Sequence, residues 1–403
     1  MSKLEELIQE LCPDGVETFP LEECCNILDK KRKPVTKNSR EKGEYPYYGA
    51  NGVQDYVSDY IFNGKFVLVG EDGSVITKSG TPVVTWAEGK IWVNNHAHVI
   101  EEKSGTMLRY LYFYIQTIDV TSLIHGNIPK LTGRDFRSLK IALPPLEIQR
   151  EIVSILDNFT ELTAELTAEL TARKTQYTYY RDKLLANSYK GEIKQLEECC
   201  DSIADGDHQA PPKADSGVPF ITISDIDERH EINLNVTKYV PDEYYNRLAD
   251  KRRPQKGDVL YTVVGSYGIP VYISENKRFV FQRHIAILRP NNAVIDSRYL
   301  YHAMNGTAFH RQADLAAKGA AQKTIGLASL AKMTVPVPPL DVQNRIVNVL
   351  DNFEKICSDL NIGLPAENEA RQKQYEYYRD KLLTFAETGN TILNGTERNG
   401  TEL

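Results

Sequence analysis

The chain of 403 residues contains the same blocks of sequence twice. Residues 144–159 read PPLEIQREIVSILDNF and residues 338–353 read PPLDVQNRIVNVLDNF, at an offset of 194 positions. Residues 176–185 (QYTYYRDKLL) return at 374–383 (QYEYYRDKLL) at an offset of 198, so the second copy carries four extra residues, which we place at 365–368. Such self-similarity predicts two equivalent halves with a pseudo-two-fold repeat, each a globular region followed by a helical one.

Apolar residues recur at helical spacing along both helical blocks. In the first copy, steps of three and four residues join Ile152, Leu156, Phe159, Leu162, Leu166 and Leu170. Residues 160–170 repeat the tetrapeptide Thr-Ala-Glu-Leu, which is rich in helix formers, whereas Gly363-Leu364-Pro365 in the second copy should break the helix. An apolar stripe along roughly forty residues of helix needs a partner. We expect the two copies to pair as long antiparallel helices in a coiled coil, with packing of each helix on its own globular region as the alternative.

The globular regions combine short strands with short helices. Strand-like runs with glycine turns between them occupy 66–69, 82–86 and 91–93 in the first region, and 258–264, 270–273 and 284–288 in the second. Short helices are expected at Met107–Gln116 and Ser297–Met304, and each region closes with a matched segment, 128–143 and 322–337 respectively. The predicted fold class is α+β, with two mixed α/β domains separated by two long helices. The expected parts are an N-terminal domain at 1–143, a helical spacer at 144–190, a C-terminal domain at 191–337, a second spacer at 338–390 and a disordered tail at 391–403.

Charge is distributed unevenly along the chain. The net charge of −7, taken alone, argues against a nucleic-acid binder. However, residues 26–50 hold seven basic residues against three acidic ones, and residues 277–289 hold four basic residues and no acidic one. Local clusters of this kind suit a phosphate backbone, with ordinary solvated lysines as the alternative.

The chain lacks the local signatures of common catalytic centres. It contains no G-x-x-x-x-G-K-[ST] loop, no Asn/Asp-Pro-Pro-aromatic element of base-directed amino methyltransferases and no Cys/His set with zinc spacing. His96-Ala-His98 would place two imidazoles on one face of a strand, but no third ligand is in view, so we assign no metal site. The six cysteines, including the adjacent pairs Cys24-Cys25 and Cys199-Cys200, are expected to be small buried residues of a reducing compartment.

The sequence gives no sign of a membrane protein. No apolar run reaches the roughly 18 residues of a membrane span, and the acidic start lacks a signal core. We therefore expect a cytoplasmic protein with no membrane partner.

The duplicated motif Pro-Pro-Leu-x-x-Gln-x-x-Ile-Val-x-x-Leu-Asp-x-Phe, followed by Tyr-Tyr-Arg-Asp-Lys-Leu-Leu, resembles the specificity subunit of type I restriction-modification systems. The Thr-Ala-Glu-Leu repeats resemble the subgroup that carries such repeats in its central helix. The resemblance covers the whole chain, the helical blocks by motif and the globular blocks by position and length.

This resemblance implies a DNA-recognition subunit without catalytic residues of its own. Each globular region would be a target recognition domain that reads one half of a bipartite, asymmetric site in double-stranded DNA, and the helices would set the spacer. The helices would also dock two modification subunits, which hold S-adenosylmethionine and methylate adenine; the chain itself would hold no cofactor. Restriction subunits that translocate and cut DNA are a further implied partner. The family's recognition domains vary, so the target sequence does not carry over.

Candidate DNA contacts are polar residues on loops, because bases are read by hydrogen bonds in the grooves. In the first half we predict base readers at Tyr47, Tyr48, Asn51, Asn94, Asn95 and His96, and phosphate contacts at Lys78 and Lys130. In the second half we predict contacts at Ser266, Tyr267, Gln282, Arg283, His284, Gln322 and Lys323. For each residue the alternative is a turn former or an ordinary surface group.

Two other functions compete with this interpretation. A fused restriction-methylation enzyme would need methyltransferase and nuclease motifs, for which the repeats leave no room. A coiled-coil scaffold with no nucleic-acid role is the second alternative, and neighbouring modification and restriction genes would distinguish it.

Overall fold

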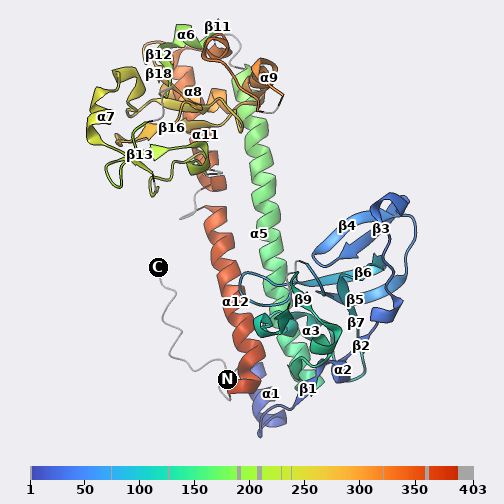
Figure 1. The fold of residues 1–403 in the computed structure, drawn as a ribbon. Coiled ribbons are helices and arrows are strands. Elements are labelled where there is room, and N and C mark those ends of the chain that lie inside the picture. The colour runs from blue at the N-terminus through green and yellow to red at the C-terminus, as the bar shows by residue number, and fades with distance from the viewer. Residues whose placement is uncertain are drawn as a thin grey trace. The chain divides into compact units, whose positions relative to one another are not determined.

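The computed structural model describes residues 2–73, 75–125, 128–187, 192–206, 211–227, 229–236, 238–320, 322–358 and 363–388. The chain folds into two compact units: unit 1 comprises Met1–Glu165 and Glu369–Leu403, and unit 2 comprises Leu166–Asn368. Each unit therefore combines one globular domain with helical segments from both copies of the repeat (Figure 1). The tail at 391–403, which we predicted to be disordered, lies outside the described residues.

A six-stranded sheet in the order β2-β7-β5-β6-β3-β4 forms the N-terminal domain in unit 1 (Figure 1). Its strands are β2 (Asn26–Ile27), β3 (Lys42–Gly49), β4 (Gly52–Val57), β5 (Phe62–Gly70), β6 (Val84–Val93) and β7 (Ala97–Glu101). Paired strands are antiparallel, except that β3 and β6 are parallel. Successive side chains of β5 alternate between the two faces: Val67 and Val69 join the core that contains α3 (Leu108–Ile115), and Phe66 and Leu68 join a second apolar cluster.

The two strand-like runs at 82–86 and 91–93 belong largely to one strand, β6. Strand β5 pairs with β6 along its length and places Gly64 opposite Gly89. Both glycines have positive φ angles, 155° and 82°, at which a side chain would be strained. Because glycine occupies both positions, the pairing of β5 with β6 continues through the polar stretch between the two runs.

Smaller elements complete the N-terminal domain. They are α1 (Lys3–Leu11), β1 (Thr18–Pro20), α2 (Leu21–Cys24), the short helices Asp29–Lys31, Lys37–Ser39 and Thr121–Leu123, β8 (Ile124–His125), β9 (Lys130–Leu131), α4 (Gly133–Arg137) and β10 (Lys140–Ala142). The pairing of β1 with β10 brings the start of the domain beside its end. Consequently the chain leaves the domain next to the point where it entered.

The C-terminal domain in unit 2 repeats the core of this sheet. Its four-stranded sheet has the order β12-β18-β15-β16, which corresponds to β2-β7-β5-β6. The strands are β12 (Cys200–Asp205), β15 (Val259–Thr262), β16 (Pro270–Tyr272) and β18 (Ile285–Pro290), all paired antiparallel. The other corresponding elements are β11 (Glu192–Gln195), α6 (Leu196–Cys199), α8 (Ser297–Met304), α10 (Leu327–Ala331) and β19 (Thr334–Val337). The internal repeat predicted from sequence is thus confirmed in three dimensions.

The two domains differ in what is inserted into this shared core. In the N-terminal domain the hairpin β3–β4 extends the sheet beyond β6. In the C-terminal domain the chain between β12 and β15 forms β13 (Val218–Ile221), β14 (Tyr239–Val240), α7 (Asp242–Arg247) and the short helices Ile223–Asp225 and Asp250–Arg252. Strand β17 (Val280–Phe281) pairs with β13, and α9 (Thr307–Ala316) follows α8. The variable parts of the halves therefore sit on a common scaffold.

Three long helices occupy the two helical blocks of the repeat. They are α5 (Leu146–Asn187), α11 (Leu340–Ser358) and α12 (Leu364–Thr388). Both copies begin directly after a Pro-Pro pair, and Pro365 lies in the first turn of α12, where proline is tolerated, so the predicted break is confirmed.

In each unit, α5 pairs with a helix of the other copy. In unit 1 the ring of Phe159 stacks on Tyr378 of α12, with ring centroids 5.4 Å apart. In unit 2 Tyr180 stacks on Phe353 of α11 at 5.8 Å, and further toward the start of α5 Asn368 donates a hydrogen bond to Thr167 at 3.2 Å. Partner numbers rise as α5 numbers fall, so the helices run antiparallel. Their apolar faces also join the domain cores, so pairing between copies and packing on the domains both occur.

In each copy of the repeat, one buried glutamine side chain on a long helix hydrogen-bonds the backbone of the neighbouring globular domain. Gln149 Oε1 accepts from the N–H of Met107 at 2.8 Å, and Nε2 donates to the carbonyls of Gly105 and Pro144. Gln343 repeats the pattern: Oε1 accepts from Asp296 N–H at 2.7 Å, and Nε2 donates to the carbonyls of Val294 and Pro338. Both side chains are 0% exposed. Since Met107 and Asp296 cap α3 and α8, each glutamine fixes the start of a domain helix on the first turn of a spacer helix.

Candidate nucleic-acid interface

Three segments that are distant in sequence meet at one edge of the C-terminal domain. The N–H of Val263 donates to the carbonyl of His284 at 2.8 Å, and the N–H of Gly265 donates to the carbonyl of Lys323 at 2.9 Å. An isolated bridge joins Val264 to Thr324. These bonds bring together all seven predicted contacts of the second half, which we call the second ridge: Ser266, Tyr267, Gln282, Arg283, His284, Gln322 and Lys323. Every member is exposed or half-buried, so polar side chains from separate loops face solvent side by side.

Local bonds give the second ridge a defined shape. The hydroxyl of Tyr267 donates to Asp314 at 2.9 Å, and this bond raises the pKa of the tyrosine. A Cβ on Gly206 would lie 2.3 Å from the carbonyl oxygen of Phe281 and 2.7 Å from the nitrogen of Arg283, so only glycine allows this close approach. Burial, and then the charge of Arg283, lowers the pKa of His284, which favours the neutral imidazole.

The N-terminal domain has an equivalent edge beside the turn that follows β5. The N–H of Leu131 donates to the carbonyl of Glu71 at 2.9 Å, and an isolated bridge joins Asp72 to Lys130. The Nδ1 of His96 contacts the carboxylate of Asp72, and the Nζ of Lys130 lies 3.3 Å from Glu71. We call His96 and Lys130, with this turn, the first ridge. In the first ridge, Glu71 partly neutralises the charge of Lys130. At the equivalent edge of the second domain, Lys323 has no ion-pair partner among the described residues.

Two of the predicted readers lie inside the N-terminal domain. Tyr47 is only 1% exposed, its hydroxyl bonds the backbone of Val35, and the guanidinium of Arg40 lies over its ring at 4.1 Å. Asn94 is 3% exposed; its Nδ2 donates to Gln54, and its Oδ1 accepts from the N–H of His96. Neither side chain has surface left for a base, so we assign both to shaping the loops that carry their neighbours.

The other predicted residues of the first half are accessible but dispersed. Tyr48 is half-buried, and its carbonyl accepts from the N–H of Asn94 at 3.1 Å, which places it near the exposed Asn95. Asn51 lies in the turn between β3 and β4, and Lys78 lies in a turn that the hydroxyls of Thr77 and Thr81 close at 2.8 Å. Among the described contacts, none joins Asn51 or Lys78 to the first ridge.

The two basic segments are less available than the charge count indicates. In 26–50, Arg32 pairs with Glu71 at 2.6 Å and Arg40 pairs with Asp55 at 3.2 Å, while the five lysines are exposed. In 277–289, acidic partners are bound by Lys277, Arg278 and Arg289. Arg283 alone of that segment has no ion-pair partner in the described ranges, which leaves its guanidinium available for a guanine or a phosphate.

Two ionic clusters each combine a histidine with two carboxylates whose donor atoms lie close enough together to hold a metal ion: Asp29, Glu71 and His98 in the N-terminal domain, and His302, Asp351 and Glu354 in unit 2. His98 is 0% exposed, and its Nδ1 lies 2.7 Å from Asp29 while Nε2 lies 3.1 Å from the carbonyl of Leu131. Burial would raise the pKa of Asp29, but the hydrogen bonds and charge of His98 lower it overall. Arg32 pairs with both carboxylates of this cluster, with Asp29 at 3.6 Å and with Glu71 at 2.6 Å.

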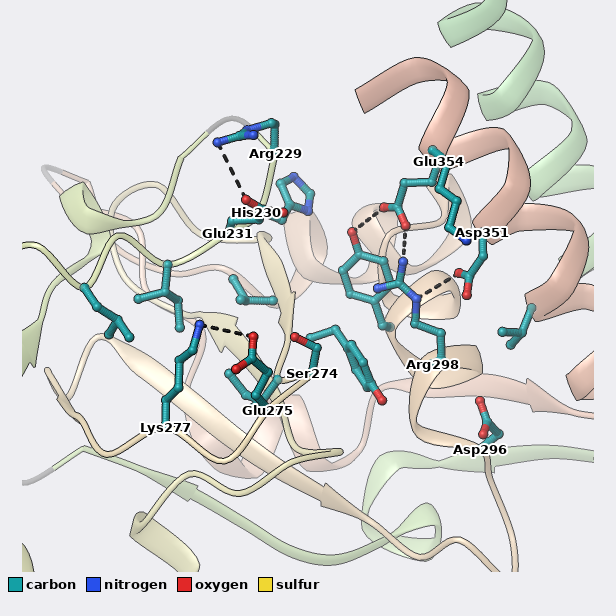
Figure 2. Close-up of a pocket in the computed structure, with 18 of the residues that line it drawn as sticks. Arg229, His230, Glu231, Ser274, Glu275, Lys277, Asp296, Arg298, Asp351 and Glu354 are labelled. Atoms are coloured by element: carbon teal, nitrogen blue, oxygen red, sulfur yellow. Dashed lines mark hydrogen bonds and ion pairs between the residues drawn. The ribbon is translucent and has the colours of Figure 1, made fainter. Parts of the chain in front are cut away.

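A second ionic cluster, in unit 2, lies beside a cavity of about 830 Å³ (Figure 2). Arg298 pairs with Asp351 at 2.8 Å and with Glu354, and its guanidinium lies 4.5 Å from the ring of Tyr301. Five acidic and four basic residues line the cavity: Glu231, Glu275, Asp296, Asp351, Glu354, Arg229, Lys277, Arg298 and Lys355. These charges nearly balance, so the cavity lacks the positive field that a phosphate backbone requires, and the ridges are the better candidate interface.

Sequence reasoning missed the positioning role of Gln149 and Gln343. The signal was present, because the glutamine is one of the identical residues of the duplicated Pro-Pro-Leu motif. Within the described residues, no helix is both long enough and apolar enough to cross a membrane.

Comparison with known proteins supports the duplicated architecture. The family model of the type I restriction modification DNA specificity domain matches residues 13–173 and 190–370. A putative type I restriction enzyme specificity subunit of Haemophilus influenzae is 35% identical over 399 residues, which cover 95% of this chain and 98% of that protein. The type I restriction enzyme EcoR124I/EcoR124II specificity subunit of Escherichia coli is 34% identical over 311 residues, which cover 70% and 72% of the two chains.

Two solved structures share the fold. The type I restriction-modification S subunit from M. genitalium has a TM-score of 0.55 at 14% identity, and the alignment covers 92% of this chain and 97% of that one. A chain from work on complex assembly and conformational transition of the type I R-M system has a TM-score of 0.57 at 18% identity, with 92% and 98% covered. At these identities the likeness concerns the fold alone.

Proposed function

The chain belongs to the family of type I restriction-modification DNA specificity subunits, and we propose that its first and second ridges each read one half of a split DNA site. The observation that carries this proposal is the duplication of the edge itself: the bonds Leu131–Glu71 and Ile325–Val263 place the matched segments beside equivalent turns in the two domains. Different residues occupy the two edges, which is what an asymmetric site requires.

Two DNA-recognition domains in one chain explain how two short half-sites can give high sequence selectivity. A good bidentate base contact contributes only about 1–3 kcal/mol of discrimination. Once one domain is bound, the second acts at high effective concentration, so their selectivities multiply. This gain requires a fixed separation, because a flexible linker would allow many spacings.

Helix α5 is proposed to set the distance between the two half-sites. Its 42 residues, equivalent to about 63 Å of helix, include segments that belong to each of the two units. The Thr-Ala-Glu-Leu stretch at 160–170 spans the boundary between the units at residues 165 and 166. A change in repeat number would therefore alter the spacer without touching either domain core.

The helices also offer a duplicated surface for the two modification subunits. Tyr179 and Tyr377 are equivalent residues of the repeated Tyr-Tyr-Arg-Asp motif, with 58% and 44% of their surface exposed. Lys183 and Lys381 lie over these rings at 5.5 and 4.6 Å. Two copies of one surface suit two copies of one partner.

Catalysis and cofactor are assigned to those partners. The chain is proposed to hold no cofactor, and S-adenosylmethionine to bind the modification subunits that methylate adenine, with restriction subunits as further partners. The net charge of −7 and the internal pairing of most arginines in the basic segments support weak DNA binding by this chain alone.

Methylome sequencing with and without this gene tests the proposal. We expect a bipartite adenine-methylated motif that disappears with the gene, and Arg283→Ala should relax one base position of one half-site only. Arg278→Ala is the matched control, since Arg278 is an exposed arginine of the same domain already paired with Asp242 at 2.6 Å. A motif that survives loss of the gene, or an absence of any methylated motif in a strain with all subunits, would favour the scaffold function.

A further inference from the structure

The two most exposed large apolar side chains among the described residues are Leu315, at 86%, and Ile128, at 69%. They belong to different domains and do not match in the sequence repeat. A single exposed aliphatic side chain needs no explanation. Their positions in the fold, however, are related.

Both residues lie at a hairpin that occurs in each domain, Ile128 inside it and Leu315 just before it. In the N-terminal domain β8 and β9 pair Ile124 with Leu131, and Ile128 lies between these strands. In the C-terminal domain Lys318 and Thr324 exchange two backbone hydrogen bonds of 2.9 and 2.8 Å, and Leu315 precedes this pair. The repeat offset of 194 relates 124 to 318 and 131 to 325, so the two hairpins occupy equivalent positions although their pairing differs by one residue.

Each hairpin belongs to a ridge. Its second strand bridges the turn after the central strand of the sheet, through Asp72–Lys130 in the first domain and Val264–Thr324 in the second. Leu315 is also joined to the second ridge through its neighbour Asp314, which accepts the hydroxyl of Tyr267. The exposed aliphatic groups therefore stand at the proposed DNA-facing edges.

Three basic residues lie near the aliphatic group of the second domain in the sequence or across its hairpin, together with its acidic neighbour Asp314. Arg311 lies one turn before Leu315 on α9, and Lys318 and Lys323 lie in the hairpin; all three are exposed and have no ion-pair partner among the described residues. This charge complements phosphate groups on either side of an apolar contact.

We propose that Leu315 and Ile128 are specificity-determining residues that contact thymine 5-methyl groups, one in each half-site. The thymine methyl is the apolar group that the major groove presents, and a branched aliphatic side chain gains by covering it. This inference rests on the proposed function, because it takes the ridges to face DNA.

Deoxyuridine substitution tests the inference with the complete methyltransferase complex. Once the methylated motif is known, each thymine in turn is replaced by deoxyuridine, which lacks only the methyl group, and Kd is measured. For the unaltered complex we expect one position in each half-site to weaken binding about fourfold, the factor for one methyl group left in water. Leu315→Ala should abolish the response in one half-site only, and Ile128→Ala the response in the other. Ile193→Ala, a 50% exposed residue of β11, is the control that should keep both responses.

Equal responses of Leu315→Ala and the unaltered complex at every thymine would overturn the inference. So would a Leu315→Ala variant that loses modification subunits on gel filtration while keeping its base preference, since the residue would then be a protein contact. Failure of the proposed function is distinguishable, because the unaltered complex would then show no sequence-specific methylation at all.

Discussion

Replacing Gln343 by leucine should loosen unit 2 and leave unit 1 intact. The side chain is 0% exposed and satisfies three backbone groups: the N–H of Asp296 and the carbonyls of Val294 and Pro338. Leucine fills a similar volume but offers no hydrogen bond. A buried polar group without a partner costs about 1–3 kcal/mol, so three groups after partial relaxation should cost about 3 kcal/mol. At about 1.4 kcal/mol per factor of ten, the opening equilibrium of α8 should rise about 150-fold.

Hydrogen exchange followed by mass spectrometry measures this effect in each unit separately. We expect the amides of α8 and of the first turn of α11 to lose protection in Gln343→Leu, while α3 is unchanged. Gln149→Leu should give the reverse pattern, and Gln372→Leu, at an exposed position of α12, should change neither. Equal loss of protection in both units, or a change of less than threefold in the amide exchange rates of α8, would refute the conclusion that each glutamine stabilises only its own domain helix.

Three further outcomes are expected. Arg298→Met removes the pairing with two carboxylates and the stack on Tyr301, and because the site is partly exposed the loss should be about 2 kcal/mol, seen as a lower Tm. Burial would raise the pKa of Asp351, but hydrogen bonds and charges of His302 and Arg298 lower it overall. The stability that this carboxylate contributes should be complete above pH about 4 and should be lost as the pH falls through its pKa in the folded protein. The free energy of unfolding should therefore fall less steeply with decreasing pH in Asp351→Asn. Tyr377→Ala should reduce the bound modification subunits from two to one in native mass spectrometry, and binding of two would contradict the assigned surface.

The helices and the duplicated core were predictable because local sequence determines them. The Pro-Pro starts and the break before Pro365 depend on backbone chemistry, and both are confirmed. The apolar stripe is confirmed at Ile152 and Leu156, which are 0% exposed, but not at Leu162, which is 36% exposed. The matched segments 128–143 and 322–337 place Leu131 and Ile325 at 0% and 1% exposure. Core positions keep their apolar character in both copies, so alignment of the chain with itself locates them.

Charge pairing was not predictable, because it depends on contacts between distant residues. Arg289 contributes to a basic segment in sequence, yet it pairs with Asp250 at 2.7 Å and Asp258 at 3.0 Å, more than thirty positions earlier. Tyr47 has the residue type of a base reader, but its strand alternation directs it into the core. Residue type and loop position therefore predicted a set of polar residues that three loops of the C-terminal domain bring together. They did not predict that Tyr47 and Asn94 of the N-terminal domain are buried.

Methylome sequencing of a variant with one extra Thr-Ala-Glu-Leu unit after Leu170 tests the central claim most directly. Four residues add about 6 Å and about 400° of helix, 40° beyond a full turn, while one DNA base pair rises about 3.4 Å and turns about 34°. We predict that the methylated motif keeps both half-sites and gains one or two base pairs of spacer. An altered half-site with an unaltered spacer would contradict an account in which two domains read DNA at a separation set by helices.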